Sequence, residues 1–202
     1  MAVKEGMISI FPTFQPLRIK YKDIFDMKEF YIAIYEWLEE NGWKDQEENL
    51  SHWERFYKER VGQGGVKEIW IQWRPYKVAE GAPLTYYLDF NFHCVGLMKT
   101  EVIKEGRKMK VNKGEVELVI KAFIEKNYEK GFKSDSILKH ILKLFNNRIY
   151  HKVIEQRRKE LYQETYALQN FIKQWLKLKR YLPYEESKNF FPSYAWPSHL
   201  KE

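Results

Sequence analysis

The chain is short of cysteine and has no long hydrophobic run, and both shortages limit what it can be. Cys94 is the single cysteine in 202 residues, so no disulfide forms within the chain and the cysteine-based zinc patterns are excluded. No segment approaches the roughly 18 uninterrupted apolar residues of a membrane span, and the first residues lack the apolar core of a signal peptide. We therefore expect a protein of a reducing compartment, the cytoplasm, with no membrane partner.

Signatures of common catalytic and cofactor sites are also missing. The sequence has no Gly-rich dinucleotide or phosphate loop and no HExxH motif, and its five histidines are widely separated. The Gly-rich stretch 62–65 is flanked by charged residues and favours a hairpin turn. We therefore predict no catalytic residue, no metal and no cofactor, and an enzymatic role is uncertain, with the balance against it.

What is present is enough to build a core, and the charge is unevenly placed. Hydrophobic residues make up 44% of the chain and aromatic residues 17%, which is typical of a folded protein rather than a disordered one. Residues 1–130 carry 21 basic and 21 acidic side chains, so the net charge of +7 lies within residues 131–202. A basic end indicates an acidic partner such as nucleic acid, although a lysine-rich solvated helix gives the same count.

The N-terminal part predicts an extended segment followed by a helix. Residues 1–25 are apolar and interrupted by Pro12 and Pro16, which suits an extended lead-in with an edge strand. Asp26 and Glu29 have the spacing of a capping box, apolar residues then recur at helical period, and Gly42 marks the end of the helix. A single domain is expected over residues 26–180.

The middle of the chain predicts antiparallel strands. Alternating residues on either side of the glycine turn 62–65 favour a hairpin, and residues 84–95 place apolar side chains on one face and polar ones on the other. A second hairpin is expected at residues 105–106, and a further turn at residues 112–114. Residues 115–126 fit a strand or a helix, and their β-branched content favours the strand.

The C-terminal third predicts two helices and an arm. One helix is expected up to about residue 149, and a second over residues 152–179, where an apolar residue recurs every seventh position. This stripe suits packing onto the sheet or pairing with another helix, in this chain or in a second copy. Residues 181–202 hold three prolines, so they predict an extended arm that docks on the body or on a partner. Its candidate docking residues are Phe190, Phe191, Tyr194 and Trp196.

Together these elements predict an α+β fold. The expected architecture is a curved antiparallel sheet of about five to six strands, with one N-terminal helix and two C-terminal helices packed on it, and an extended C-terminal arm. The order of helix, strands and long C-terminal helices resembles that of helix-grip folds, such as the START and polyketide-cyclase-like group. This resemblance concerns the order of elements and implies a fold, not an activity.

The basic helices carry the strongest functional signal. Residues 133–180 hold 12 basic and 4 acidic side chains. Basic side chains repeated along a helix suit contacts with successive phosphates. The leading hypothesis is a non-enzymatic protein that binds RNA or a ribonucleoprotein, with exposed aromatic residues stacking on unpaired bases. The candidate nucleic-acid-binding residues are Lys139, Lys143, Arg148, Lys152, Arg157, Arg158, Lys159, Lys173 and Lys177.

Two alternatives from other functional classes remain open. The sheet could enclose an apolar ligand in a cavity lined by Leu84, Tyr86, Leu88, Phe90 and Trp73. Alternatively, helix 152–179 and the arm would join two copies of the chain into a homodimer. These alternatives differ in salt sensitivity, in stabilisation by apolar ligands and in concentration-dependent mass.

Overall fold

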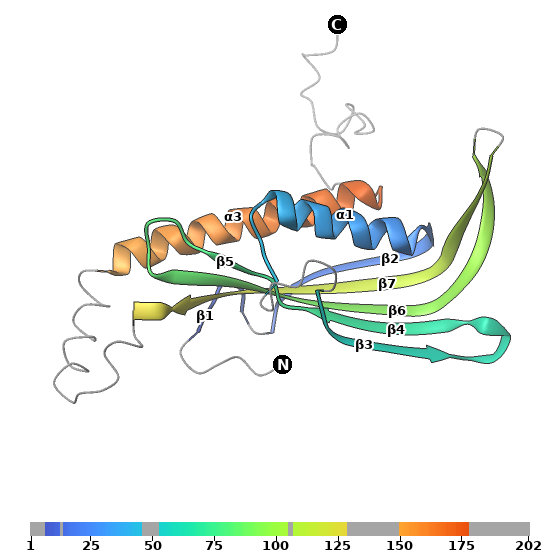
Figure 1. Ribbon diagram of the computed structural model, residues 1–202, viewed down its shortest axis with the longest axis horizontal. Coiled ribbons are helices and arrows are strands. Elements are labelled where there is room, and N and C mark those ends of the chain that lie inside the picture. The colour runs from blue at the N-terminus through green and yellow to red at the C-terminus, as the bar shows by residue number, and fades with distance from the viewer. Residues whose placement is uncertain (1–6, 13, 46–52, 105–106, 129–149, 178–202) are drawn as a thin grey trace, which may run out of the picture.

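The described part of the chain folds into a seven-stranded antiparallel sheet with two helices over one face (Figure 1). The computed structural model describes residues 7–12, 14–45, 53–104, 107–128 and 150–177. The strands are β1 (Ile8–Ser9), β2 (Leu17–Phe25), β3 (Glu54–Val61), β4 (Lys67–Trp73), β5 (Tyr76–Val78), β6 (Leu84–Lys104) and β7 (Arg107–Lys126). The helices are α1 (Met27–Glu40) and α3 (His151–Trp175). The α+β class is confirmed, whereas five to six strands was an underestimate.

Two long strands, β6 and β7, form the centre of the sheet and pair with each other along almost their full length. Strands β1 and β2 pair with different stretches of β7 on its free side. Strands β4 and β5 likewise pair with different stretches of β6. Strand β3 adds to β4 as an edge. All nine residues of β2 have partners in β7, which confirms the extended conformation predicted there and explains part of the additional strand count.

Helix α1 begins and ends where the sequence predicts. The side chain of Asp26 accepts hydrogen bonds from the backbone N–H groups of Lys28 and Glu29, at 3.0 and 3.1 Å. These bonds satisfy donors that have no partner inside the helix. At the other end Asn41 is the C-cap, and Gly42 has a φ of 77°, which glycine adopts without steric cost. The chain then turns into the isolated bridge between Lys44 and Tyr76.

The turn predicted at residues 112–114 is wrong, because β7 runs through it without interruption. The glycine there serves a β-bulge in the facing strand, where the register shifts between Val95 and Met98 and Gly96 has a φ of 65°. A Cβ atom on Gly114 would lie 3.0 Å from the Cα of Leu97 and 3.1 Å from the Gly96 carbonyl oxygen. Gly114 is therefore required by close backbone approach, and the bulge bends the hairpin.

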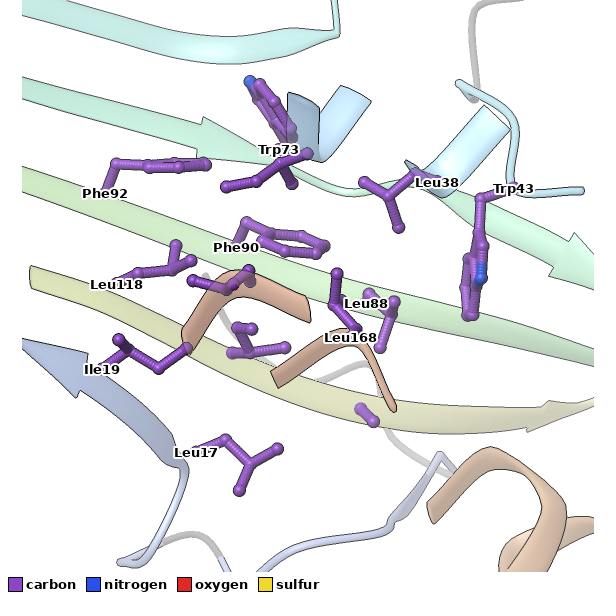
Figure 2. Close-up of a cluster of buried hydrophobic side chains, with 14 of the residues drawn as sticks. Leu17, Ile19, Leu38, Trp43, Trp73, Leu88, Phe90, Phe92, Leu118 and Leu168 are labelled. Atoms are coloured by element: carbon purple, nitrogen blue, oxygen red, sulfur yellow. The ribbon is translucent and has the colours of Figure 1, made fainter. Parts of the chain in front are cut away.

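The core lies between the helices and the inner face of the sheet (Figure 2). Leu38 of α1 and Leu168 of α3 are fully buried beside Leu88 and Phe90 of β6. The apolar stripe of the C-terminal helix contributes Ile154, Leu161, Leu168 and Trp175 to buried or half-buried positions. This stripe packs within the chain, both on the sheet and on α1, so the two alternatives predicted from the sequence, sheet packing and helix pairing within the chain, occur together.

Two ring contacts hold α1 and α3 side by side. The rings of Phe30 and Trp175 lie 5.0 Å apart between centroids, and those of Trp37 and Phe171 lie 6.2 Å apart. The C-terminal end of α3 therefore runs along α1, with Trp175 beside its first turn and Phe171 beside its last. The helix predicted up to residue 149 and the arm at residues 181–202 lie outside the described residues, so these two expectations stay predictions.

We expect the substitution Gly114→Ala to destabilise the protein by about 1–3 kcal/mol, because the new methyl group overlaps the backbone of the bulge. Urea unfolding followed by tryptophan fluorescence measures this loss. Gly62→Ala is the matched control, since a Cβ there meets its nearest atom at an ordinary 3.6 Å. The control should change stability by no more than about 0.5 kcal/mol, and equal losses in both variants would contradict the steric account.

Candidate nucleic-acid interface

The two arginines predicted as contacts on α3 are engaged by neighbouring acceptors. Arg157 donates to Glu160 at 2.7 Å and to the backbone carbonyl of Glu80 at 2.6 Å. Arg158 pairs with Glu155 of the same helix at 2.7 Å. Both guanidinium groups therefore already have a carboxylate partner, which weakens their attraction for phosphate.

The lysines predicted on this helix do not gather at one place. Lys152 and Lys159 are exposed near its beginning, and Lys173 is partly exposed in its last turn. At 1.5 Å per residue, Lys152 and Lys173 are about 31 Å apart along the helix axis. Lys177 is exposed just after the helix, with a φ of 53°. The remaining predicted contacts lie outside the described residues: Lys139, Lys143, Arg148, Phe190, Phe191, Tyr194 and Trp196.

The polar row on the outer face of β6 is satisfied by neighbouring strands. Asp89 forms a buried two-point pair with Arg74, in which Nη2 donates to Oδ2 at 2.6 Å. Tyr87 donates to Glu125 at 2.8 Å. His93 Nε2 lies 2.9 Å from Glu68. The row is therefore a set of cross-strand contacts, and it presents no cluster of free groups for acid–base chemistry.

The five residues proposed to line an apolar cavity lie in the packed core, and one of them, Tyr86, also borders the second cavity described below. Leu84, Leu88, Phe90 and Trp73 are each at most 1% exposed and share one cluster with side chains of both helices. Cys94 is buried in the same cluster, and this desolvation raises the pKa of its thiol to about 12. Among the described residues, no group of three or more metal-ligating side chains comes together. No described helix is long and apolar enough to cross a membrane.

The most basic part of the described sheet is its far end, beyond the bulge at Gly96. Residues 98–113 carry six Lys and Arg against two Glu. Lys99, Lys108, Lys110 and Lys113 are exposed, and none of them forms an ion pair with another described residue. Figure 1 shows this part of β6 and β7 extending past the helices and curving to their side of the sheet. We call these residues, 98–104 and 107–113, the distal hairpin.

Apolar side chains lie exposed among the lysines of the distal hairpin. Ile103 is 73% exposed, and Met98 and Met109 are each 44% exposed. A two-stranded ribbon with free cations and exposed apolar groups has the chemistry to contact a phosphate backbone and the sugar or base surfaces next to it. Sequence reasoning missed this site because the count over residues 1–130 is neutral, although the local composition of 98–113 already carried the signal.

A groove of about 820 Å³ lies at the base of the distal hairpin, next to the first turn of α1. Its lining includes Ile69 and Ile71 of β4 and Leu97 of β6, which are buried, so the floor of the groove is apolar. The tyrosines Tyr31 and Tyr57 line it together with Glu54 and Glu59, and its cations are Lys28, Lys67 and Lys99. We call this cavity the distal groove.

Hydrogen bonds fix the polar groups of the distal groove. The hydroxyl of Tyr57 donates to Glu59 at 2.6 Å, which helps to raise the pKa of Tyr57 to about 12. The ammonium of Lys67 lies 2.6 Å from the other oxygen of Glu59, and its hydrogen bond lowers the pKa of that carboxyl. Tyr31 donates to Glu54. Both carboxylates are therefore oriented by partners while the cavity stays open.

A second cavity, of about 650 Å³, lies between the end of α1, β5 and α3. It is bordered by bonds that already join these elements: Glu164 accepts from Trp43 Nε1 at 2.9 Å and from Lys77 at 2.8 Å. The Tyr86 hydroxyl is buried there without a hydrogen bond of normal geometry to a described residue. Four glutamates and three basic side chains line this cavity, so its charge does not favour an anion or a cation.

Comparison with protein-family models, with curated proteins and with solved structures gives no match for this chain. A functional assignment therefore depends on the geometry and charge of the two features at the far end of the sheet, the distal hairpin and the distal groove.

We expect Cys94 to be unreactive in the native protein at pH 8, because burial keeps its thiol protonated and out of contact with reagent. Absorbance after addition of a disulfide reagent measures the labelled fraction, which should stay near zero over an hour. Unfolding in urea should release one thiol per chain. Rapid labelling without denaturant would contradict the position of Cys94 in the core.

Proposed function

We propose that this protein is a non-enzymatic RNA-binding protein whose distal hairpin makes the main contacts with phosphates. The observation that carries the proposal is the concentration of exposed lysines without ion-pair partners, among the described residues, on a two-stranded ribbon that extends past the helices. Cations of this kind release condensed counterions when they meet a nucleic-acid backbone, and that release drives binding.

The distal hairpin is a better candidate than α3 for the main contact. The described helix carries five Lys and Arg against three Glu, and its two arginines are paired with two of those acids. Lys152 and Lys159 at the beginning of α3 would then make a secondary contact. The basic residues of 133–149, which include Lys139, Lys143 and Arg148, would extend that contact.

Two features favour RNA over duplex DNA. Exposed apolar side chains on the distal hairpin, such as Ile103 and Met109, lie among its lysines and suit contact with unstacked nucleotides. The distal groove beside them places tyrosines within reach of the same strand. An RNA partner agrees with the cytoplasmic location expected from the sequence.

A helix-grip-like arrangement of the C-terminal elements also remains part of this proposal.

The homodimer alternative now has fewer surfaces available to it. The apolar stripe of α3 is buried against the sheet and α1, so that stripe is not free to pair with a second copy. The arm at residues 181–202 is the other segment to which the sequence assigns this role. A mass that rises with concentration and falls on deletion of the arm would support assembly instead.

We expect the double substitution Lys108→Glu with Lys110→Glu to weaken RNA binding at least tenfold at 100 mM salt. Loss of two phosphate contacts should also reduce the slope of log K against log salt by about two. Fluorescence anisotropy with a labelled RNA hairpin that has a single-stranded tail, repeated at several salt concentrations, measures both changes.

The matched control is Lys152→Glu with Lys159→Glu, a second pair of charge reversals at exposed lysines. This control should weaken binding by less than threefold if the distal hairpin is the main contact. The reverse ranking would move the interface to α3, and an absence of salt-dependent binding by the unmodified protein would overturn the proposed function.

A further inference from the structure

We propose that the distal groove holds an unpaired RNA base that carries an exocyclic amino group, stacked on Tyr57. This inference deepens the proposed function and rests on it. The groove lies directly at the base of the distal hairpin, and it combines an apolar floor, an exposed aromatic ring and oriented carboxylates. Together these are the groups that a flipped-out base contacts on its face and on its edge.

The groove and the hairpin share residues, so one strand of RNA can reach both. Lys99 and Asn112 face each other across β6 and β7, and both line the groove at the point where the hairpin begins. Lys108 and Lys110 lie further along the same two-stranded ribbon. An RNA backbone bound by Lys108 and Lys110 would pass Lys99 on its way to the groove, so that a base of the same strand could enter the cavity.

The ring of Tyr57 is placed as a stacking platform. It is 54% exposed, although it lines the groove. The cross-strand register pairs Tyr57 with Ile71, so the ring stands on the groove side of the edge strand and above the apolar floor. The hydrogen bond from its hydroxyl to Glu59 restrains the ring, which reduces the entropy lost on stacking.

The hydrogen-bonding groups of the groove favour an amino-bearing base. Glu54 and Glu59 present acceptor oxygens, and a carboxylate accepts naturally from the amino group of cytosine or adenine. Glu59 is already occupied by Tyr57 and Lys67, which leaves Glu54 as the acceptor with more free capacity. Uracil offers no amino group, so it is the base that the groove should disfavour.

The helix end beside the groove does not compete as a phosphate site. The backbone N–H of Met27 donates to Asn112 Oδ1 at 3.3 Å, and Asp26 accepts from the next two N–H groups. The donors of the first turn are therefore occupied by the protein itself. The cations left for the flanking phosphates are Lys28 and Lys99, at the rim of the same cavity.

The test compares binding of the full-length protein to a labelled decamer of cytidine, a decamer of uridine and a fully paired duplex. The decamer of cytidine should bind at least threefold more tightly than the decamer of uridine. Tyr57→Ala should weaken binding of the cytidine decamer roughly tenfold, as expected for loss of one stacked base, and should leave duplex binding within twofold. Tyr57→Phe should retain most of the affinity, because it keeps the ring.

Two further variants make the assignment specific. Glu54→Gln, which adds an amide donor, should reduce the preference for cytidine over uridine to less than twofold. Tyr162→Ala removes another exposed tyrosine, on α3, and should have no effect on any of the three RNAs. Circular dichroism of each variant confirms that the fold is retained.

The outcomes separate the inference from the proposed function. If Tyr57→Ala weakens all three RNAs equally, or none, the groove does not hold a base, even when the Lys108 and Lys110 reversals still weaken binding tenfold. If those reversals change nothing while Tyr57→Ala weakens the cytidine decamer, the base site stands and the distal hairpin is not the phosphate contact. If the protein binds no RNA, both proposals fall.

Discussion

A mismatch of lengths between strands and helices shapes this molecule. Strand β6 has 21 residues, which at about 3.3 Å per residue would extend for roughly 70 Å. Helix α1 has 14 residues and α3 has 25, so at 1.5 Å per residue they span about 21 and 37 Å. Two such helices, lying side by side, cannot cover the central hairpin. Among the described residues, one end of the sheet therefore has a core, and neither helix covers the other end.

The bulge at Gly96 marks the boundary between these two ends. Before it, alternate residues of β6 such as Phe90, Phe92 and Cys94 are buried under the helices. One extra residue at the bulge bends the ribbon, and the groove-side positions that follow include Lys99 and Asn112. This irregularity in backbone pairing thus lies between the part of each strand that packs under the helices and the part that carries the exposed residues of the distal hairpin.

How much of this was predictable from the sequence depends on how local the signal is. The cap at Asp26, the glycine turn at 62–65 and the alternation in 84–95 are short-range patterns, and they predicted the right elements. The pairing of β2 with β7 joins residues about 100 positions apart, and only tertiary structure reveals it. Gly114 was wrongly predicted to lie in a turn, because glycine is favoured both where the chain reverses and where two backbones approach closely.

The candidate site was harder to predict than the fold, for a different reason. Charge counted over long segments pointed to the C-terminal third, whereas side-chain pairing decides which charges remain free. Arg157 and Arg158 have acidic partners one turn away, a pattern already present in their i, i+3 spacing. The distal groove combines residues from α1, β3, β4, β6 and β7, so no window of sequence contains it.

The composition of β3 has a consequence for how copies of this protein behave at high concentration. This edge strand has the sequence ERFYKERV, and its Lys58 and Arg60 are exposed on a row that pairs with β4 on one side alone among the described strands. An open edge strand can pair with a strand of another copy of the chain. Closely spaced charges oppose that pairing, because the second strand would have to bury them. We therefore expect the charges of β3 to disfavour edge-to-edge pairing between copies of the chain.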